Sequence, residues 1–482
     1  MSGLLQYIEA LSKIPRRMFF ASVIWLFVGA FFGPYMVLAQ LTRSESPAEY
    51  YIAMSLHGLI TTFPGLFQFT ASLSLLRAGF CNGRRTDTWL EKLLFIFLNL
   101  GGLLALSAVV MGVRTSYTLM FPLPAAGLGL MWGRPELTLF VIGVIMLVAA
   151  IALVYPASLA RLLFFGRSVP DLVLEKSLGN LSPRGMMGMV PAVFILPTVG
   201  APVLLAAASA ALFLLGLPAI VQLLEPVNFN YAFWLFAHTL MEVMGVMALG
   251  TAYWVISRCT ESREAVLYSD TLGRVAILIY TIAAPFAFGH HLYTMSSTQP
   301  FGLSVVSQIA SWLVGFGAAF SVFNIAATLA KYKAKISPPL LAAYLGFTLY
   351  IADGFLAMLL ATIGLSFVMH GTYFATAHLM AILLAVFLMW LGDFYRHQSL
   401  LLPSKIGDRA AYVHIATTFV AAVGLLYAFS WLGSQSVIRR TYPMAPFAPT
   451  DGLLIIAAFG LLLAFSQIYF LVQIIRTVFK RK

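Results

Sequence analysis

The stretch PFAFGHHLYT, residues 285–294, places two adjacent histidines, His290 and His291, at the end of a long apolar run. An imidazole costs free energy in an apolar environment unless it finds a partner. Two imidazoles in succession therefore indicate a binding site rather than ordinary packing. That interpretation requires a chain that crosses a membrane and brings further ligands to the same depth.

The composition predicts a polytopic all-α membrane protein. Of the 482 residues, 61% are hydrophobic and 10% are charged, which leaves too little polar surface for a water-soluble domain. Apolar runs of about 20 residues, the length of a membrane-spanning helix, recur along the chain. We predict helices because lipid requires internally satisfied backbone groups, in a single transmembrane domain over residues 1–482. The twelve predicted spans are 17–41, 48–76, 93–112, 137–160, 188–216, 229–257, 275–294, 301–330, 339–365, 371–395, 411–433 and 451–475.

The net charge of +12 follows from membrane orientation and does not require a nucleic-acid partner. Lys and Arg residues concentrate in alternate loops, a pattern that marks the cytoplasmic side; one such loop is expected to hold Arg77. Both termini are therefore predicted to be cytoplasmic. Of the 29 Lys and Arg residues, five are expected on the outer side: Arg43, Arg114, Arg134, Arg439 and Arg440.

The histidines gather at one predicted depth. Two of the eight, His397 in an inner loop and His414 near the inner end of span eleven, are expected to be structural. A single histidine in a span is most often a satisfied core residue, but six in the outer half of the membrane indicate metal or haem iron. These six are His57, His238, His290, His291, His370 and His378.

Helix geometry groups these histidines into sites. Adjacent residues on an α-helix point about 100° apart, so His290 and His291 can flank one ion if a third ligand comes from another helix. His238 is the candidate, and Glu242 in FAHTLMEVMG follows it by four residues on the same helix face. Three imidazoles and a carboxylate favour non-haem iron over copper.

His378 and Met380, in ATAHLMAI, point about 200° apart on one helix, so that helix can contact two haems. His378 alone would leave an open position on a high-spin haem, whereas His57 and Met380 would hold a low-spin haem. Ligation by His and Met raises the potential relative to two histidines. The alternative is that Met380 is a core filler, since the chain has 20 methionines.

Three further groups carry charge near these sites. Arg439 and Arg440, in VIRRTYPM, are candidates to bind haem propionates, as is His370; ordinary interfacial arginines are the alternative. Asp353, in LYIADGFLAM, is a carboxylate at mid-membrane depth. It is predicted either to belong to a proton path from the inner side or to pair with a neighbouring helix.

Together these residues resemble subunit I of the haem–copper oxidase superfamily, over essentially the whole chain. The single histidines of spans two and six, the pair in span seven, the two histidines eight residues apart before and in span ten, and the arginine pair all match. The stretches FFGPYMVL and LHGLITTF are most similar to the B-type oxidases. The resemblance implies the twelve-helix subunit I fold, a low-spin haem, expected to be haem b, at His57, a high-spin haem at His378, and a non-haem metal at His238, His290 and His291.

Two departures from the oxygen-reducing members of this family are informative. Most carry a redox tyrosine at the position of Glu242, and one branch carries it six residues before the histidine pair, where this chain has Ala284. Nitric oxide reductases carry glutamate at the first position, where it joins the iron site. Met380 stands where nearly all relatives have the second low-spin histidine, which leaves either a His57/Met380 haem or a changed or lost low-spin site.

The function implied is that of the catalytic subunit of a membrane nitric oxide reductase in a denitrifying respiratory chain, converting two NO to N2O and water. The alternatives are a B-type-like terminal oxidase reducing O2, a nitric oxide dismutase or, from another class, a transporter without haem. The two cysteines form no haem-attachment motif. Electrons are therefore expected from a small cupredoxin-like or haem c subunit, or from quinol. The expected location is the bacterial or archaeal cytoplasmic membrane, with the active site towards the outer side.

Overall fold

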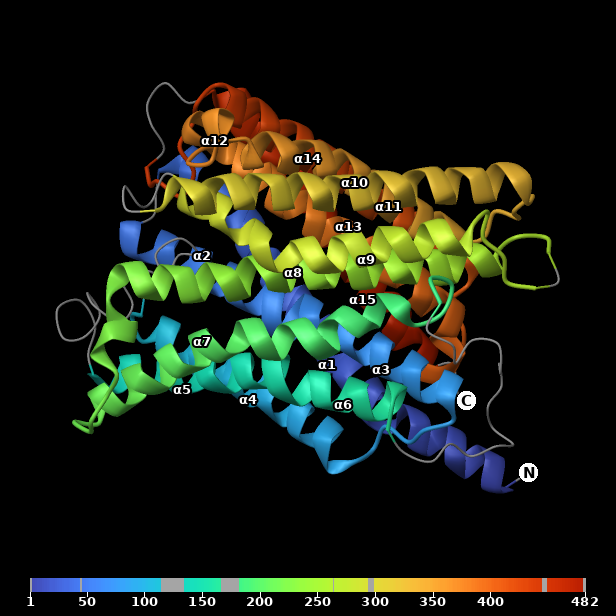
Figure 1. Cartoon of the computed structure of the whole chain (residues 1–482). Coiled ribbons are helices and arrows are strands. Elements are labelled where there is room, and N and C mark those ends of the chain that lie inside the picture. Colours follow the sequence, from blue (N-terminus) through green and yellow to red (C-terminus); the bar gives the residue numbers. More distant parts are fainter. Residues whose placement is uncertain are drawn as a thin grey trace.

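In the computed structural model, the chain folds as a bundle of long helices (Figure 1). The structure describes residues 2–43, 46–113, 134–165, 182–262, 264–293, 299–443 and 449–479. In this part of the chain, twelve stretches are long and apolar enough to cross a membrane, which confirms the predicted number. They are Ser12–Thr42, Pro47–Asn82, Trp89–Val110, Pro135–Leu163, Met187–Leu214, Val227–Arg258, Asp270–Leu292, Phe301–Lys331, Pro338–Ala361, Tyr373–Leu401, Asp408–Ser434 and Thr450–Phe479.

The α-helices and shorter helical turns follow one another along the whole described chain. The α-helices are α1 (Ser2–Thr42), α2 (Pro47–Ile60), α3 (Gln68–Asn82), α4 (Trp89–Val110), α5 (Arg134–Ala149), α6 (Tyr155–Leu163), α7 (Val190–Leu214), α8 (Pro226–Arg258), α9 (Asp270–Ala287), α10 (Phe301–Lys331), α11 (Pro338–Ala361), α12 (Ile363–Met369), α13 (Tyr373–Leu401), α14 (Asp408–Ser434) and α15 (Thr450–Phe479). The π-helices are η1 (Thr61–Phe67) and η3 (Ala150–Val154), and the 3₁₀ turns are η5 (Met187–Met189), η6 (Val221–Leu224) and η7 (Phe288–Leu292). Extended pairing in the described chain is confined to two isolated bridges, Thr260 with Ala334 and Thr372 with Ile438.

Proline interrupts three of the spans without ending them. Proline lacks an amide proton and clashes with the preceding helical turn, so the helix around it adjusts locally. Pro64 lies inside η1, and Pro156 directly follows η3. Pro285 lies near the end of α9, just before η7. The pair His290 and His291 therefore sits on a 3₁₀ turn, where successive side chains point about 120° apart, rather than on the α-helix that the sequence predicted.

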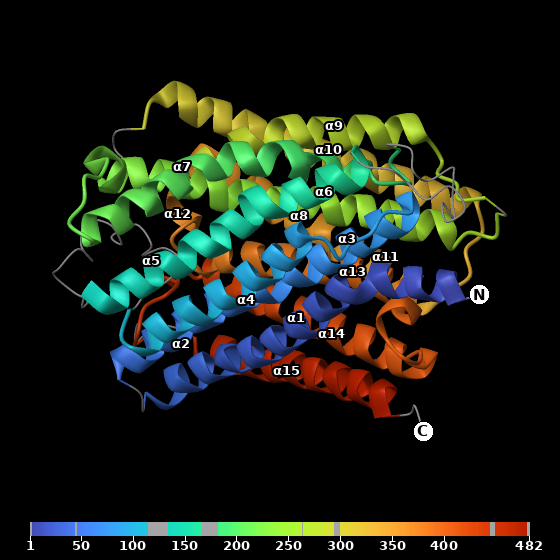
Figure 2. The same cartoon turned by 90° about the horizontal axis from the view of Figure 1, so that it is seen from below.

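Helix α8 forms the centre of the bundle. In its most apolar window 94% of the residues are buried, against 22% for α1 at the edge. Figure 1 and Figure 2 show α8 running among α7, α9, α11 and α13. Side chains on α8 are therefore surrounded by protein, the setting in which a polar site inside a membrane can be sealed from lipid.

The two ends of the chain lie at the same end of the bundle (Figures 1 and 2). Helix α2 begins at the opposite end, as does α13, so His57 and His378 lie in the half of the bundle away from the termini. This agrees with the predicted common depth. Some charges used to predict the orientation lie outside the described residues: Arg114, Arg167, Lys176, Arg263, Lys480, Arg481 and Lys482, and the side chain of Arg134 is likewise not described.

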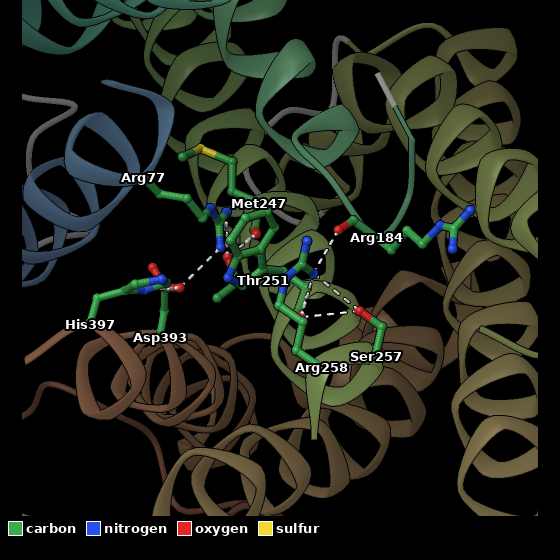
Figure 3. Close-up of polar contacts among 9 residues, drawn as sticks. Arg77, Arg184, Met247, Thr251, Ser257, Arg258, Asp393 and His397 are labelled. Carbon is green, nitrogen blue, oxygen red and sulfur yellow. Dashed lines mark hydrogen bonds and ion pairs between the residues drawn. The ribbon is translucent and has the colours of Figure 1, made fainter. Parts of the chain in front are cut away.

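A buried charged cluster joins α3, α8 and α13 near the end of the bundle that holds the termini (Figure 3). Arg77 Nη1 lies 3.5 Å from Asp393 Oδ1, and both side chains are at most 2% exposed. Arg77 also donates to Thr251 Oγ1 over 3.1 Å and lies over the Trp254 ring. His397 Nδ1 donates to Asp393 Oδ1 over 3.1 Å.

Two predictions about this end of the bundle were wrong. Arg77 was expected in a loop, but it lies within α3, because the apolar span continues to Asn82 and the guanidinium finds a carboxylate inside the protein. His397 was also expected in a loop, but α13 extends to Leu401. A sequence pattern locates a charge along the chain but does not show the partner that allows it to be buried.

The first prediction concerns the Arg77–Asp393 pair. Asp393→Asn removes the buried partner of Arg77, so we expect the free energy of unfolding in detergent to fall by about 3 kcal/mol. Asp87→Asn is the matched control, because Asp87 pairs with Arg85, which is 62% exposed, and an exposed pair contributes roughly 0 to 1 kcal/mol. Equal stability losses in the two variants would contradict a special role for the buried pair.

Candidate active site

Three imidazoles converge between α8 and η7. One ring nitrogen from each of His238, His290 and His291 lies within 4.8 Å of the other two. The rings of His238 and His290 are 4.7 Å apart and perpendicular, and those of His290 and His291 are 4.4 Å apart. The three predicted metal-ligating histidines are therefore brought together, with two coming from one turn and one from the central helix.

Hydrogen bonds hold two of these rings at one nitrogen each. His290 Nδ1 lies 3.1 Å from Ser311 Oγ on α10, and His291 Nδ1 lies 2.8 Å from His370 Nε2. Trp234 stacks on the His291 ring at 4.0 Å. A bond at Nδ1 fixes the orientation of an imidazole and leaves Nε2 to bind a metal.

The third ring has an unsatisfied nitrogen. His238 Nδ1 is buried and has no hydrogen-bond partner among the residues that the structure describes. A buried polar atom without a partner costs roughly 1–3 kcal/mol, so the His238 ring lacks the fixing hydrogen bond that the other two rings have. The nitrogen-rich, buried donor set therefore fits a transition-metal ion.

Glu242 lies beside this group, as its spacing predicted. Glu242 Oε1 is 3.6 Å from His238 Nε2, one helical turn along α8. Its other carboxylate oxygen, Oε2, accepts a hydrogen bond from the Tyr280 hydroxyl. The carboxylate is therefore directed towards His238 on one side and held by a tyrosine on the other.

Two tyrosines at the site were missed by the sequence analysis. The Tyr350 hydroxyl on α11 donates to the Tyr280 hydroxyl on α9 over 2.6 Å, so a chain of hydrogen bonds leads through Tyr280 to Glu242. Gly245 makes room for both hydroxyls, because a Cβ there would lie 2.8 Å from the Tyr280 oxygen. The small residue one turn after Glu242 was the available signal, but spacing alone does not name a partner on another helix.

His378 pairs with the mid-membrane carboxylate. Its Nδ1 donates to Asp353 Oδ1 over 2.7 Å, and the side chains are 16% and 4% exposed. Both residues line a small cavity together with His238, His290 and Glu242. The structure thus places Asp353 against the histidine predicted to bind the high-spin haem.

The two residues predicted for the low-spin haem lie along α1. His57 Nδ1 is 2.8 Å from the Gly29 carbonyl oxygen, and a Cβ at Gly33 would lie 3.4 Å from the His57 ring. Met380 packs in a cluster with Val37 of α1. The structure shows both side chains near α1 but gives no contact that joins them.

His370 lies closer to the metal group than its proposed role as a propionate partner implied. It directly follows α12, which ends at Met369, and precedes α13, which begins at Tyr373, rather than lying at the start of span ten. Burial holds the pKa of His370 well below its usual range, and the nearby positive charge of Arg439 lowers it further. A neutral His370 suits its contact with His291.

The segment with Arg439 and Arg440 forms hydrogen bonds near His370. The Arg439 amide donates to the Gly371 carbonyl over 3.2 Å, and the Tyr51 hydroxyl donates to the Arg440 carbonyl over 3.3 Å. Met444, the last residue of VIRRTYPM, lies outside the described residues. The arginine pair is therefore placed between His370 and the start of α2.

An apolar groove lies against another face of α8. Side chains of α2, α5, α7 and α8 line it, including Phe140, Val203, Phe236, Ala237 and Met241. Ala237 directly precedes His238 in sequence. The groove suits small apolar molecules and does not distinguish one gas from another.

Comparison with known proteins shows the family to which the chain is similar. The family model described as "Cytochrome C and Quinol oxidase polypeptide I" matches residues 13–463. The "Alternative cytochrome c oxidase subunit 1" of Bradyrhizobium diazoefficiens is 23% identical over 263 residues, which is 53% of this chain and 44% of the relative. The "Cytochrome c oxidase subunit 1" of Thermostichus vulcanus is 24% identical over 252 residues, 52% of this chain and 44% of the relative. The chain thus spans less than half the length of the curated relatives it matches.

Solved structures share the fold. The structure of a haem–copper terminal oxidase dimer superposes with a TM-score of 0.75 at 18% identity, covering 97% of this chain and 84% of that one. The predicted twelve-helix architecture is therefore confirmed. With a family model matching nearly the full length, the chain belongs to the cytochrome c and quinol oxidase polypeptide I family.

Proposed function

We propose that the chain is the catalytic subunit of a membrane nitric oxide reductase, which combines two NO molecules, two electrons and two protons to give N2O and water. The observation that carries the proposal is the Glu242 carboxylate, 3.6 Å from His238 in the three-histidine group. A carboxylate oxygen added to three imidazole ligands would make the donor set harder, and a harder set favours iron over copper.

The residues present suit three redox groups. His378 would hold a high-spin haem, His57 with or without Met380 a low-spin haem b, and the three-histidine group with Glu242 a non-haem iron. When bound, these groups supply the electrons and the open coordination positions that NO requires. Arg439 and Arg440 would receive the haem propionates.

The protein's own groups can manage the protons. Each turnover consumes two protons inside an apolar bundle, so a relay is needed. The Tyr350 hydroxyl donates to Tyr280, and Tyr280 donates to Glu242. A proton given up at the Glu242 carboxylate can be replaced along this chain without water entering the site.

The proposal also places the chain in a respiratory membrane. Its site would face the outer half of a bacterial or archaeal cytoplasmic membrane, as the distribution of Lys and Arg favours. Electrons would arrive from a cupredoxin-like or haem c subunit, or from quinol. The twelve apolar helices would be surrounded by the lipid bilayer.

A terminal oxidase is the second candidate, and two observations favour it. The curated relatives are named cytochrome c oxidase subunits, and Tyr280 and Tyr350 lie at the site. Reduction of O2 to water needs four electrons, and a tyrosine can supply one. The two candidates share the fold and the histidines and differ in what Glu242 does.

The second prediction concerns the metal content of the purified chain. We expect two haem irons and one non-haem iron per chain, without copper. His290→Ala removes one of three ligands and should lose the non-haem iron while both haems remain. His414→Ala is the control, because His414 is buried at the inner end of α14 beside Tyr395 and should change no metal. Stoichiometric copper would favour the oxidase instead.

The third prediction concerns Glu242. Replacing it with Ala removes both a donor oxygen and the end of the proton relay, so N2O formation should fall about a hundredfold. N2O is measured by gas chromatography and O2 uptake by electrode, with the exposed Glu264→Ala as control. Rapid O2 uptake by the wild type, with negligible N2O, would rule out the reductase.

The fourth prediction tests Met380. If Met380 ligates the low-spin haem, Met380→His should change the ligation to two histidines and lower the midpoint potential of that haem. Redox titration followed by visible absorbance measures this potential. An unchanged potential would assign Met380 to the apolar core, where it packs in the structure.

A further inference from the structure

Asp353 and His378 form a buried acid–imidazole pair on neighbouring helices. Asp353 is 3% exposed, and its Oδ1 accepts from His378 Nδ1 over 2.7 Å. The side chain of His378 also borders the cavity that contains His238, His290 and Glu242. With Nδ1 engaged by the carboxylate, His378 has Nε2 left as its one free ring nitrogen for a ligand.

The negative charge of the buried Asp353 carboxylate is best balanced by a positive charge on or beyond the His378 ring. A buried carboxylate is costly without a positive partner. In the described residues, the ion pair formed by Asp353 is with His378, and the other polar side chains lining the cavity include Glu242, Tyr280 and Tyr350, none of them cationic. A positive metal centre on the far nitrogen of His378 would balance the carboxylate through the ring.

We propose that Asp353 is the positioning residue for the axial ligand of the high-spin haem. Its carboxylate accepts the Nδ1–H of His378, fixes the tautomer that presents Nε2 to iron, and increases the electron density on the imidazole. This inference rests on the proposed function only in taking His378 as a haem ligand. It holds for either the reductase or the oxidase.

The pair has two measurable consequences. An imidazole that shares its proton with a carboxylate donates more strongly to iron, which stiffens the iron–nitrogen bond. The same donation stabilises ferric over ferrous iron and lowers the potential of that haem, since hydrogen bonding to an axial ligand is one of the means by which a protein tunes haem potential. A carboxylate that served only to pack α11 against α13 would change neither quantity.

The experiment uses the purified haem-loaded protein. Resonance Raman spectra of the reduced high-spin haem give the iron–histidine stretching band, and redox titration gives the potential. Asp353→Asn should shift the band to lower frequency and raise the potential of this haem. Asp353→Glu keeps a carboxylate within reach and should restore much of both values.

Controls separate this inference from the proposed function. His397→Asn disrupts the similar Asp393–His397 pair on the same helix and should leave the band in place. An unchanged band in both Asp353 variants would overturn the role of Asp353. Persistence of the band in His378→Ala would overturn the haem-ligand assignment itself, whereas N2O formation by the same preparation tests the reductase activity independently.

Discussion

The site depends on hydrogen bonds that fix one ring nitrogen of three of its imidazoles. Ser311 holds His290, His370 holds His291, and Asp353 holds His378. A polar ring buried in a membrane bundle needs a partner within the protein, and each of these three rings finds it on another segment of the chain. The positions of α10, α11 and α12 around α8 and α13 follow from this requirement.

Much of this arrangement can be predicted from the sequence because it is periodic. Apolar runs give the spans, the alternation of Lys and Arg between loops predicts that both termini lie on one side, and the four-residue spacing places Glu242 beside His238. The contacts between helices could not be predicted in the same way. The contacts of His370 with His291, of Asp353 with His378 and of Tyr280 with Glu242 join residues 25 to 79 positions apart, and no local pattern connects them. The 3₁₀ turn at the histidine pair likewise depends on how Pro285 is accommodated.

The same cavity holds two carboxylates with different surroundings. Glu242 lies on α8 against the three-histidine group and accepts from a tyrosine, so it can exchange a proton with that tyrosine. Asp353 lies on α11 and accepts from an imidazole that is itself a proposed ligand. A carboxylate committed to such a bond is poorly suited to relay protons. These contacts favour a role in proton transfer for Glu242. They favour a different role for Asp353, which is to increase the electron density on the His378 imidazole.

The positions of Tyr280 and Tyr350 are compatible with the proposal that the substrate is NO rather than O2. A tyrosine four residues after His238 would share the face of that histidine, but this chain has Glu242 there, and Tyr280 reaches the site from α9. The Tyr280 hydroxyl donates to the Glu242 carboxylate. The Tyr350 hydroxyl in turn donates to the Tyr280 hydroxyl. In that position the phenol supports the carboxylate and can pass it protons. The carboxylate, not the phenol, then lies nearest the His238 imidazole, which supports the proposed iron site for NO.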